Sequence, residues 1–170
     1  MKRTPEDLRR MMDRFEAAIR EAGVKRTPQR IEIYRQTAAR EDHPDIETIH
    51  RKVRKTMPCV SLDTVYRTLG LFRELGLVSN VRTLSGHPRF DANTAPHHHF
   101  VCTRCGLTRD FTDPGFDALK VPEAARALGR AESARLEVRG LCPACAAAGN
   151  SARTKGTRFH RIKKNPKRRD

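Results

Sequence analysis

Four cysteines are spaced as ligands for a tetrahedral metal ion. Cys102 and Cys105 form one Cys-x-x-Cys pair, and Cys142 and Cys145 form a second. Each pair makes a tight turn in which two sulfurs converge, so two turns can close a four-thiolate cage around Zn²⁺. The 36 residues between the pairs must carry secondary structure of their own. Two disulfides or four unrelated thiols are the alternative.

Three histidines just before the first pair indicate a second metal site without thiolates. On a strand, His97 and His99 would face one side and His98 the other. Imidazole and carboxylate ligands suit Fe²⁺, Mn²⁺ or Zn²⁺ in a five- or six-coordinate site. Further candidate ligands are Asp91, Asp110 and His43. Taken singly, a histidine such as His43 is more often an ordinary loop residue, and an aspartate such as Asp91 is more often a turn residue.

A site that used all of these ligands would join two parts of the chain. His43 and Asp91 precede the cysteine-rich region, whereas the other candidates lie within it. Metal occupancy would then favour one relative orientation of the two parts. This is a hypothesis for metal-gated DNA binding.

The N-terminal half predicts helices followed by a two-stranded ribbon, which is the pattern of a winged helix. Apolar residues recur at helical spacing, and Thr27 and Ser61 are suited to cap helix starts. We expect a turn at residues 84–87 between the two strands. The expected elements are helices over 1–22, 28–38, 46–53 and 62–75, and strands over 77–83 and 88–91.

The helix that begins after Ser61 is the candidate DNA-reading helix. Val65, Leu69 and Phe72 form its buried stripe together with Leu62, and other side chains remain free for DNA. The predicted base-reading residues are Tyr66 and Arg67, with Thr64 and Arg73 as phosphate contacts and Lys25, Arg26 and Arg30 as backbone or minor-groove contacts. Cys59 precedes this helix, and we expect it to be a small buried residue rather than a redox switch.

Beyond Asp91 the pattern changes to strands. We expect strands over 98–102, 107–111 and 131–139, a helix over 117–128 and a short helix near residues 146–148. Residues 151–170 are polar and basic without periodicity, so we expect a disordered tail. This tail could add affinity for DNA or only solubility.

The charge is unevenly distributed along the 170 residues. The net charge is +15: residues 1–90 carry 19 Lys and Arg against 12 Asp and Glu, residues 91–150 carry seven of each, and residues 151–170 carry nine against one. A nucleic-acid partner for the basic parts is the leading interpretation. No apolar segment resembles a signal peptide or a membrane span, and metal-spaced cysteines suit a reducing compartment, so we expect a cytoplasmic protein.

These motifs together resemble the ferric uptake regulator (Fur) family of bacterial metal-dependent repressors, over roughly residues 20–148. The similarity rests on Thr27–Arg30, Ser61–Leu69, His97–His99 and the two cysteine pairs. It implies an α+β chain: a winged-helix DNA-binding domain over 1–91 with an extra N-terminal helix, then a small α/β dimerisation and metal-binding domain over 92–150. It also implies a structural zinc and a homodimer on palindromic operator DNA.

Within this family the chain is most similar to the peroxide-sensing repressor (PerR) branch. The resemblance implies a regulatory Fe²⁺ or Mn²⁺ site formed by His43, Asp91, His97, His99 and Asp110. An aspartate at the position of Asp110 is typical of peroxide sensors, whereas iron-responsive members have Glu. Oxidation of His43 or His97 by bound Fe²⁺ and H₂O₂ would release DNA. A third metal site of some members is not expected, because its histidine is replaced around residues 133–135.

Three other functions remain open from sequence. An iron-responsive repressor of the same family differs only in its signal. A zinc metalloenzyme would need an open zinc position, which a four-thiolate cage lacks, so we expect no enzymatic activity. A zinc-stabilised RNA-binding protein is disfavoured because aromatic residues make up only 5% of the chain.

Overall fold

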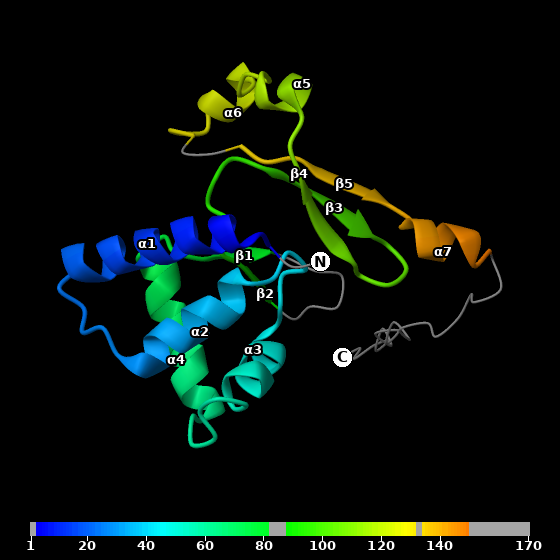
Figure 1. The fold of residues 1–170 in the computed structure, drawn as a ribbon. Coiled ribbons are helices and arrows are strands. Elements are labelled where there is room, and N and C mark those ends of the chain that lie inside the picture. Colours follow the sequence, from blue (N-terminus) through cyan, green and yellow to red (C-terminus); the bar gives the residue numbers. More distant parts are fainter. Residues whose placement is uncertain (1–2, 82–87, 132–133, 150–170) are drawn as a thin grey trace, which may run out of the picture.

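The computed structural model describes residues 3–81, 88–131 and 134–149 and shows two packed parts (Figure 1). Four helices and a two-stranded sheet form the first part. A three-stranded sheet flanked by short helices forms the second part. The predicted α+β class is confirmed, whereas the exact domain boundaries stay a prediction. The basic tail over 151–170 lies outside the described residues.

Each of the four N-terminal helices begins at a residue that caps it. The side chains of Thr4, Thr27, Asp45 and Ser61 accept a hydrogen bond from the backbone N–H three residues later, which satisfies a donor that the helix leaves unpaired. The helices are α1 (Pro5–Glu21), α2 (Pro28–Ala38), α3 (Ile46–Val53) and α4 (Leu62–Glu74).

An aromatic cluster joins the extra helix α1 to the rest of the bundle. Phe15 stacks on Tyr34 with ring centroids 4.7 Å apart, and Phe72 meets both rings edge-on at 5.5 and 5.6 Å. All three side chains are buried. Burial also raises the pKa of Tyr34 to about 12, because the phenolate would lose its hydration. Helix α1 is therefore part of the winged-helix core.

The ribbon of the winged helix consists of β1 (Ser79–Val81) and β2 (Arg89–Asp91), which pair antiparallel with Ser79 opposite Asp91. The turn predicted at residues 84–87 lies outside the described residues. Strand β2 also holds the loop between α2 and α3. Phe90 donates its N–H to the Pro44 carbonyl at 3.0 Å, so this loop lies beside the end of β2.

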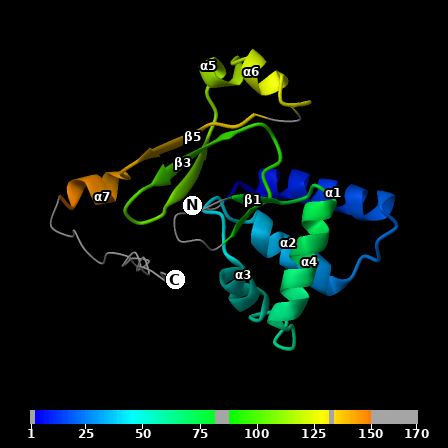
Figure 2. The same cartoon turned by 180° about the vertical axis from the view of Figure 1, so that it is seen from behind.

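The second sheet has the order β4-β3-β5. Its strands are β3 (His98–Cys102), β4 (Thr108–Phe111) and β5 (Glu137–Gly140), and helix α7 (Pro143–Ala147) follows β5. Strand β3 is antiparallel to β4 and parallel to β5. Seen from behind, the sheet lies beside the helical bundle (Figure 2). No helix in the described part of the chain is long and apolar enough to cross a membrane.

Two predicted elements are shorter in the structure. The helix expected over 117–128 is replaced by α5 (Pro114–Asp117) and α6 (Glu123–Arg126). Pro122 separates them, because proline has no N–H and restricts the preceding residue. In the described part of the segment expected as a strand over 131–139, the strand begins at Glu137. The N–H of Leu136 donates to the ring of His98 at 3.2 Å, which takes that donor away from the strand pairing.

Candidate metal centres and DNA-facing helix

The four cysteines meet at one end of the three-stranded sheet. One sulfur from each of Cys102, Cys105, Cys142 and Cys145 lies within 4.8 Å of the others. The sulfurs of Cys105 and Cys142 are 3.8 Å apart. Two sulfurs at 2.3 Å from a tetrahedral Zn²⁺ are about 3.8 Å apart, so the cluster fits this ion. The four thiols are free, which excludes the disulfide alternative here.

Backbone geometry prepares Cys102 to bind a metal as a thiolate. Hydrogen bonds from the backbone at Cys105 and Cys142 lower the pKa of Cys102 to about 6. The N–H of Cys142 lies 3.3 Å from this sulfur. Arg104 fixes the two turns to each other, because its guanidinium donates to the carbonyls of Cys145 and Gly149 at 2.6 and 2.7 Å. The cage is therefore held by the backbone as well as by its sulfurs.

A second cluster lies at the boundary between the two parts of the molecule. One ligand atom from each member lies within 4.8 Å of the others: His43, Asp91, His97, His99 and Asp110. His43 and Asp91 come from the winged helix. The other three come from the second part: His97 directly precedes β3, His99 lies on β3, and Asp110 lies on β4. The structure thus brings together all five residues suggested for the regulatory site. Their role as ligands stays a prediction.

The backbone at His43 adopts an uncommon conformation to reach this cluster. Its φ is 49°, in the left-handed region that residues other than glycine rarely adopt. Arg89 holds the loop in place by donating to the carbonyls of Asp42 and His43 at 3.1 and 3.3 Å. Such backbone strain persists only where the surroundings enforce it, and here it directs a buried imidazole toward the carboxylates.

Unpaired buried atoms support a cation at the centre of the cluster. His43 Nε2 lies 2.8 Å from Asp110 Oδ1, and His97 Nε2 lies 2.9 Å from Asp91 Oδ2. Nevertheless, among the described residues His43 Nε2, Asp91 Oδ2 and Asp110 Oδ1 have no partner with hydrogen-bond geometry. Buried polar atoms without partners are costly. Nitrogen and oxygen donors that share one space fit Fe²⁺ or Mn²⁺.

Without a metal, the cluster attracts protons to its histidines. Burial alone would lower the pKa of His43, but the carboxylates of Asp110 and Asp91 outweigh it and raise this pKa to about 9. Burial would likewise raise the pKa of Asp91, yet the three surrounding histidines hold it well below its usual range. The carboxylates therefore stay ionised, and a metal must displace protons from the imidazoles.

The middle histidine faces away from this cluster, as strand alternation predicts. His98 Nε2 lies 3.1 Å from Asp117 Oδ1, and its ring packs against Phe111 and Phe116. In contrast, His97 Nε2 lies 2.9 Å from His99 Nε2. His98 is therefore a natural internal control for substitutions in the cluster.

Two further residues that the sequence analysis did not single out lie beside the carboxylates of the cluster. Asn93 donates its side-chain N–H to Asp110 Oδ2 at 3.3 Å. Arg3 Nη2 lies 3.7 Å from Asp91 Oδ1 and 3.8 Å from Asp110 Oδ2. Asn93 is only two residues from Asp91, which is a weak signal, but Arg3 is far away in the chain and no motif points to it.

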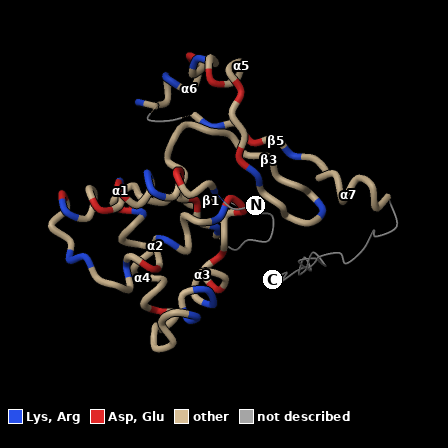
Figure 3. The backbone as a smooth tube through the Cα atoms, viewed as in Figure 1, with Lys and Arg blue, Asp and Glu red and all other residues tan. Residues whose placement is uncertain are grey.

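The predicted DNA-reading helix α4 presents polar side chains to solvent. Tyr66 is 67% exposed, and Arg67 forms an exposed ion pair with Asp63 at 2.8 Å. Arg73 is also exposed, whereas Thr64 bonds the hydroxyl of the capping Ser61 at 2.9 Å. Basic residues also lie on α3 and on the segment between α1 and α2 (Figure 3).

The other predicted DNA contacts lie on that segment between α1 and α2 and in the first turn of α2. Lys25 and Arg26 are exposed, and Arg26 pairs with Glu16 at 2.8 Å. Arg30 is half-buried and donates to the Lys25 carbonyl. Two expectations are wrong: Leu62 is 42% exposed and Cys59 is exposed, because the first turn of α4 and the preceding turn lie on the surface.

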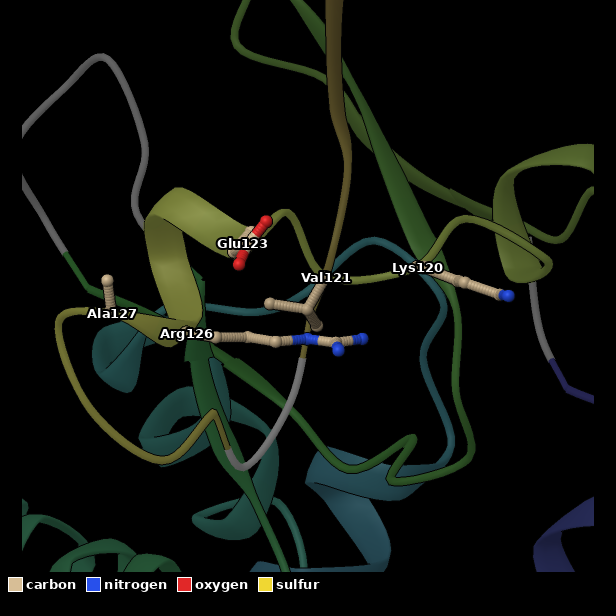
Figure 4. A pocket seen from close by; sticks show the side chains of 5 residues that line it. All are labelled: Lys120, Val121, Glu123, Arg126 and Ala127. Carbon is tan, nitrogen blue, oxygen red and sulfur yellow. The ribbon is translucent and has the colours of Figure 1, made fainter.

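Two surface hollows lie near α5 and α6. A larger one is lined mainly by apolar residues, among them Leu119, Val121 and Leu136. A smaller one is lined by Lys120, Val121, Glu123, Arg126 and Ala127 (Figure 4). The smaller hollow shares no residue with either metal cluster. Its exposed charged side chains indicate an ordinary solvated surface.

Comparisons with known proteins agree with this geometry. The model of the ferric uptake regulator family matches residues 21–139. The peroxide-responsive repressor PerR of Staphylococcus epidermidis is 33% identical over 136 residues, which cover 79% of this chain and 89% of that protein. The peroxide operon regulator of Bacillus subtilis is 34% identical over 132 residues, covering 78% and 91%. The Helicobacter pylori ferric uptake regulator has the same fold, with a TM-score of 0.67 at 22% identity over 82% of this chain and 93% of that one.

Proposed function

Because this chain belongs to the ferric uptake regulator family, we propose that it represses transcription from operator DNA and senses hydrogen peroxide through iron held by the His/Asp cluster. At the coarser level it is a metal-responsive repressor of this family and not an enzyme. The single observation that carries the finer proposal is the meeting of five buried or half-buried nitrogen and oxygen ligands at the boundary between its two parts.

The position of the cluster supports a coupling between metal and DNA. His43 and Asp91 belong to the winged-helix part, while His97, His99 and Asp110 belong to the part with the three-stranded sheet. Ligands from both sides of the boundary hold the two parts in one orientation only while all of them share the ion. Two winged helices of a homodimer must have a fixed spacing to match the two halves of a palindromic operator.

The peroxide response depends on which donors can be lost. Ferrous iron bound here would reduce H₂O₂. One oxygen atom of the peroxide would then be added to a nearby imidazole. His43 and His97 are the residues at risk, and both are buried within the cluster. An oxidised ring is a poorer donor, so His43 would no longer tie the winged helix to Asp110. The preferred orientation, and with it the affinity for DNA, would be lost.

Asp110 and two relatives named for their peroxide response favour peroxide over iron as the signal. A shorter carboxylate is typical of the peroxide-sensing branch at this position, and two curated relatives over 30% identical are named for their peroxide response. An iron-responsive repressor remains the second candidate, because the same ligand types serve both. The two differ in whether oxidation accompanies release.

The test is operator binding by the zinc-loaded protein with Fe²⁺ and, separately, with Mn²⁺, each before and after H₂O₂. We expect release only in the iron sample, with a mass increase of one oxygen on a peptide that contains His43 or His97. Mn²⁺ is the matched control because it supports the same geometry without the peroxide reaction. Retention of DNA by the iron form after peroxide, with no added oxygen, would leave the iron-responsive reading.

A further inference from the structure

Arg3 lies against the carboxylate side of the His/Asp cluster, although it precedes the residues matched by the family model. Its guanidinium Nη2 lies 3.7 Å from Asp91 Oδ1 and 3.8 Å from Asp110 Oδ2. The Arg3 side chain is only 11% exposed. A nearly buried cation therefore faces the same two carboxylates that would hold the regulatory metal.

The contact is not a well-formed ion pair. Both distances exceed the 2.7–2.9 Å of a charge-assisted hydrogen bond, and Arg3 Nε is buried without a hydrogen-bond partner among the described residues. A buried guanidinium that uses few of its donors is held by charge and packing more than by direct bonds. Such a group can leave without breaking a network.

Helix α1 carries Arg3 to this place. The N-cap Thr4 follows directly and fixes the start of the helix. Phe15 and Ile19 are buried in the winged-helix core, and Arg14 donates to the carbonyl of Gly76 at 2.8 Å. In both views the N-terminal end of α1 reaches the boundary between the bundle and the three-stranded sheet (Figures 1 and 2).

A hollow beside Arg3 offers room for its side chain outside the cluster. It lies between α1 and residues 92–95 and is lined by Arg3, Asp7 and Asn93, among others. Asp7 offers a carboxylate on the first turn of the same helix, where it already pairs with Arg10. The guanidinium can thus exchange the carboxylates of the cluster for a carboxylate at the protein surface.

From these contacts we infer that Arg3 is a built-in competitor of the regulatory metal. In the metal-free protein its positive charge balances Asp91 and Asp110. A divalent cation that binds the same carboxylates repels the guanidinium and displaces it toward the hollow. Arg3 therefore weakens metal binding and sets the concentration at which the repressor loads. This inference rests on the proposed metal site.

The test is the affinity of the zinc-loaded, full-length protein for Mn²⁺, measured by competition with a metal-sensitive fluorescent chelator. Arg3→Gln removes the charge, Arg3→Lys keeps it, and Arg9→Gln is the matched control on the same helix, where the side chain is exposed and does not line the hollow. We expect Arg3→Gln to lower the Kd for Mn²⁺ about tenfold, since a like charge a few ångströms from the ion is removed. Arg3→Lys and Arg9→Gln should stay within about threefold of the wild type.

Tighter binding is a result that damage to the fold cannot produce, because a disordered site binds more weakly. An unchanged or higher Kd in Arg3→Gln, while the wild type still binds one Mn²⁺ beyond its zinc, would overturn the role of Arg3 and leave the metal site standing. Binding of no second metal by the wild type would overturn both.

Discussion

His43 Nε2 lies 2.8 Å from Asp110 Oδ1, although the two residues belong to different parts of the molecule. His43 lies in the loop between α2 and α3 of the winged helix, and Asp110 lies on β4 of the three-stranded sheet. This contact connects the part predicted to bind DNA with the part that carries the four cysteines. A substitution of either residue therefore affects both parts of the molecule.

Loss of one cluster ligand should remove the second metal but leave the zinc. We expect His99→Ala to abolish stoichiometric Mn²⁺ binding, because His99 Nε2 faces both carboxylates at 3.6 and 3.8 Å. His98→Ala is the matched control on the neighbouring position of β3, where the ring faces Asp117 instead. Elemental analysis of both variants should give one zinc per chain. Equal loss of Mn²⁺ in the two variants would contradict the assignment.

Loss of one thiolate should release the zinc and unfold the second sheet. Cys142 is buried and supplies one sulfur of the cluster, so Cys142→Ser removes a ligand but keeps the backbone N–H that approaches the sulfur of Cys102. We expect zinc-free protein with loss of the sheet signal in circular dichroism, because structural zinc contributes folding free energy directly. Cys59→Ser is the control, since Cys59 is exposed and is not a member of the four-cysteine cluster.

Mn²⁺ binding should strengthen as the pH rises from 6.5 to 9. The folded-state pKa of His43 is raised to about 9, so a proton competes with the metal across this range. The Kd should fall by up to about tenfold per pH unit for each proton released. Isothermal titration calorimetry in buffers of different ionisation enthalpy gives the number of protons. A pH-independent Kd would show that His43 is already neutral in the metal-free protein.

Stability of the metal-free, zinc-loaded protein should change in the opposite direction. A raised pKa means that protonated His43 stabilises the folded state fully below pH 6.5, and that this contribution disappears as the pH rises through about 9. We expect Tm to fall by several degrees over that interval, since about 1 kcal/mol corresponds to roughly 2–4 °C at this size. Excess Mn²⁺ should suppress the decrease.

Truncation of Phe15 should destabilise the winged helix although α1 lies largely outside the family match. Phe15 is fully buried between Tyr34 and Phe72. We expect Phe15→Ala to lower the free energy of unfolding by about 3–5 kcal/mol, as for other large-to-small changes in a core. Arg9→Ala on the exposed side of the same helix should cost less than about 0.5 kcal/mol. Urea denaturation measures both.

Removal of Arg67 should weaken operator binding by the metal-loaded protein. The side chain is exposed on α4 and pairs with Asp63. Loss of a bidentate base contact costs about 1–3 kcal/mol and relaxes specificity at one position, whereas loss of a phosphate contact weakens all sequences alike. Arg139→Ala, on the exposed side of β5, is the control. Fluorescence anisotropy with operator and scrambled duplexes separates the two roles.

Local signals in the sequence determined the helices, their caps and the cysteine turns. Thr27-Pro28 and Ser61 place helix starts because capping depends on residues only three positions apart. Alternation on β3 separates His98 from its neighbours for the same reason, since strand geometry is local. Pro122 was available in the sequence to break the helix expected over 117–128, and the apolar periodicity around it misled the prediction.

Only the tertiary structure decided what meets at the boundary. The convergence of His43 with Asp110 requires β2 to hold the loop between α2 and α3 against the second sheet, through Arg89 and Phe90. The approach of Arg3 requires the whole of α1 to pack on the bundle through Phe15. These contacts depend on packing between residues far apart in the chain. Composition and periodicity contain no information on such long-range contacts. The family resemblance therefore suggested the five ligands, whereas only the fold revealed that Arg3 lies beside them.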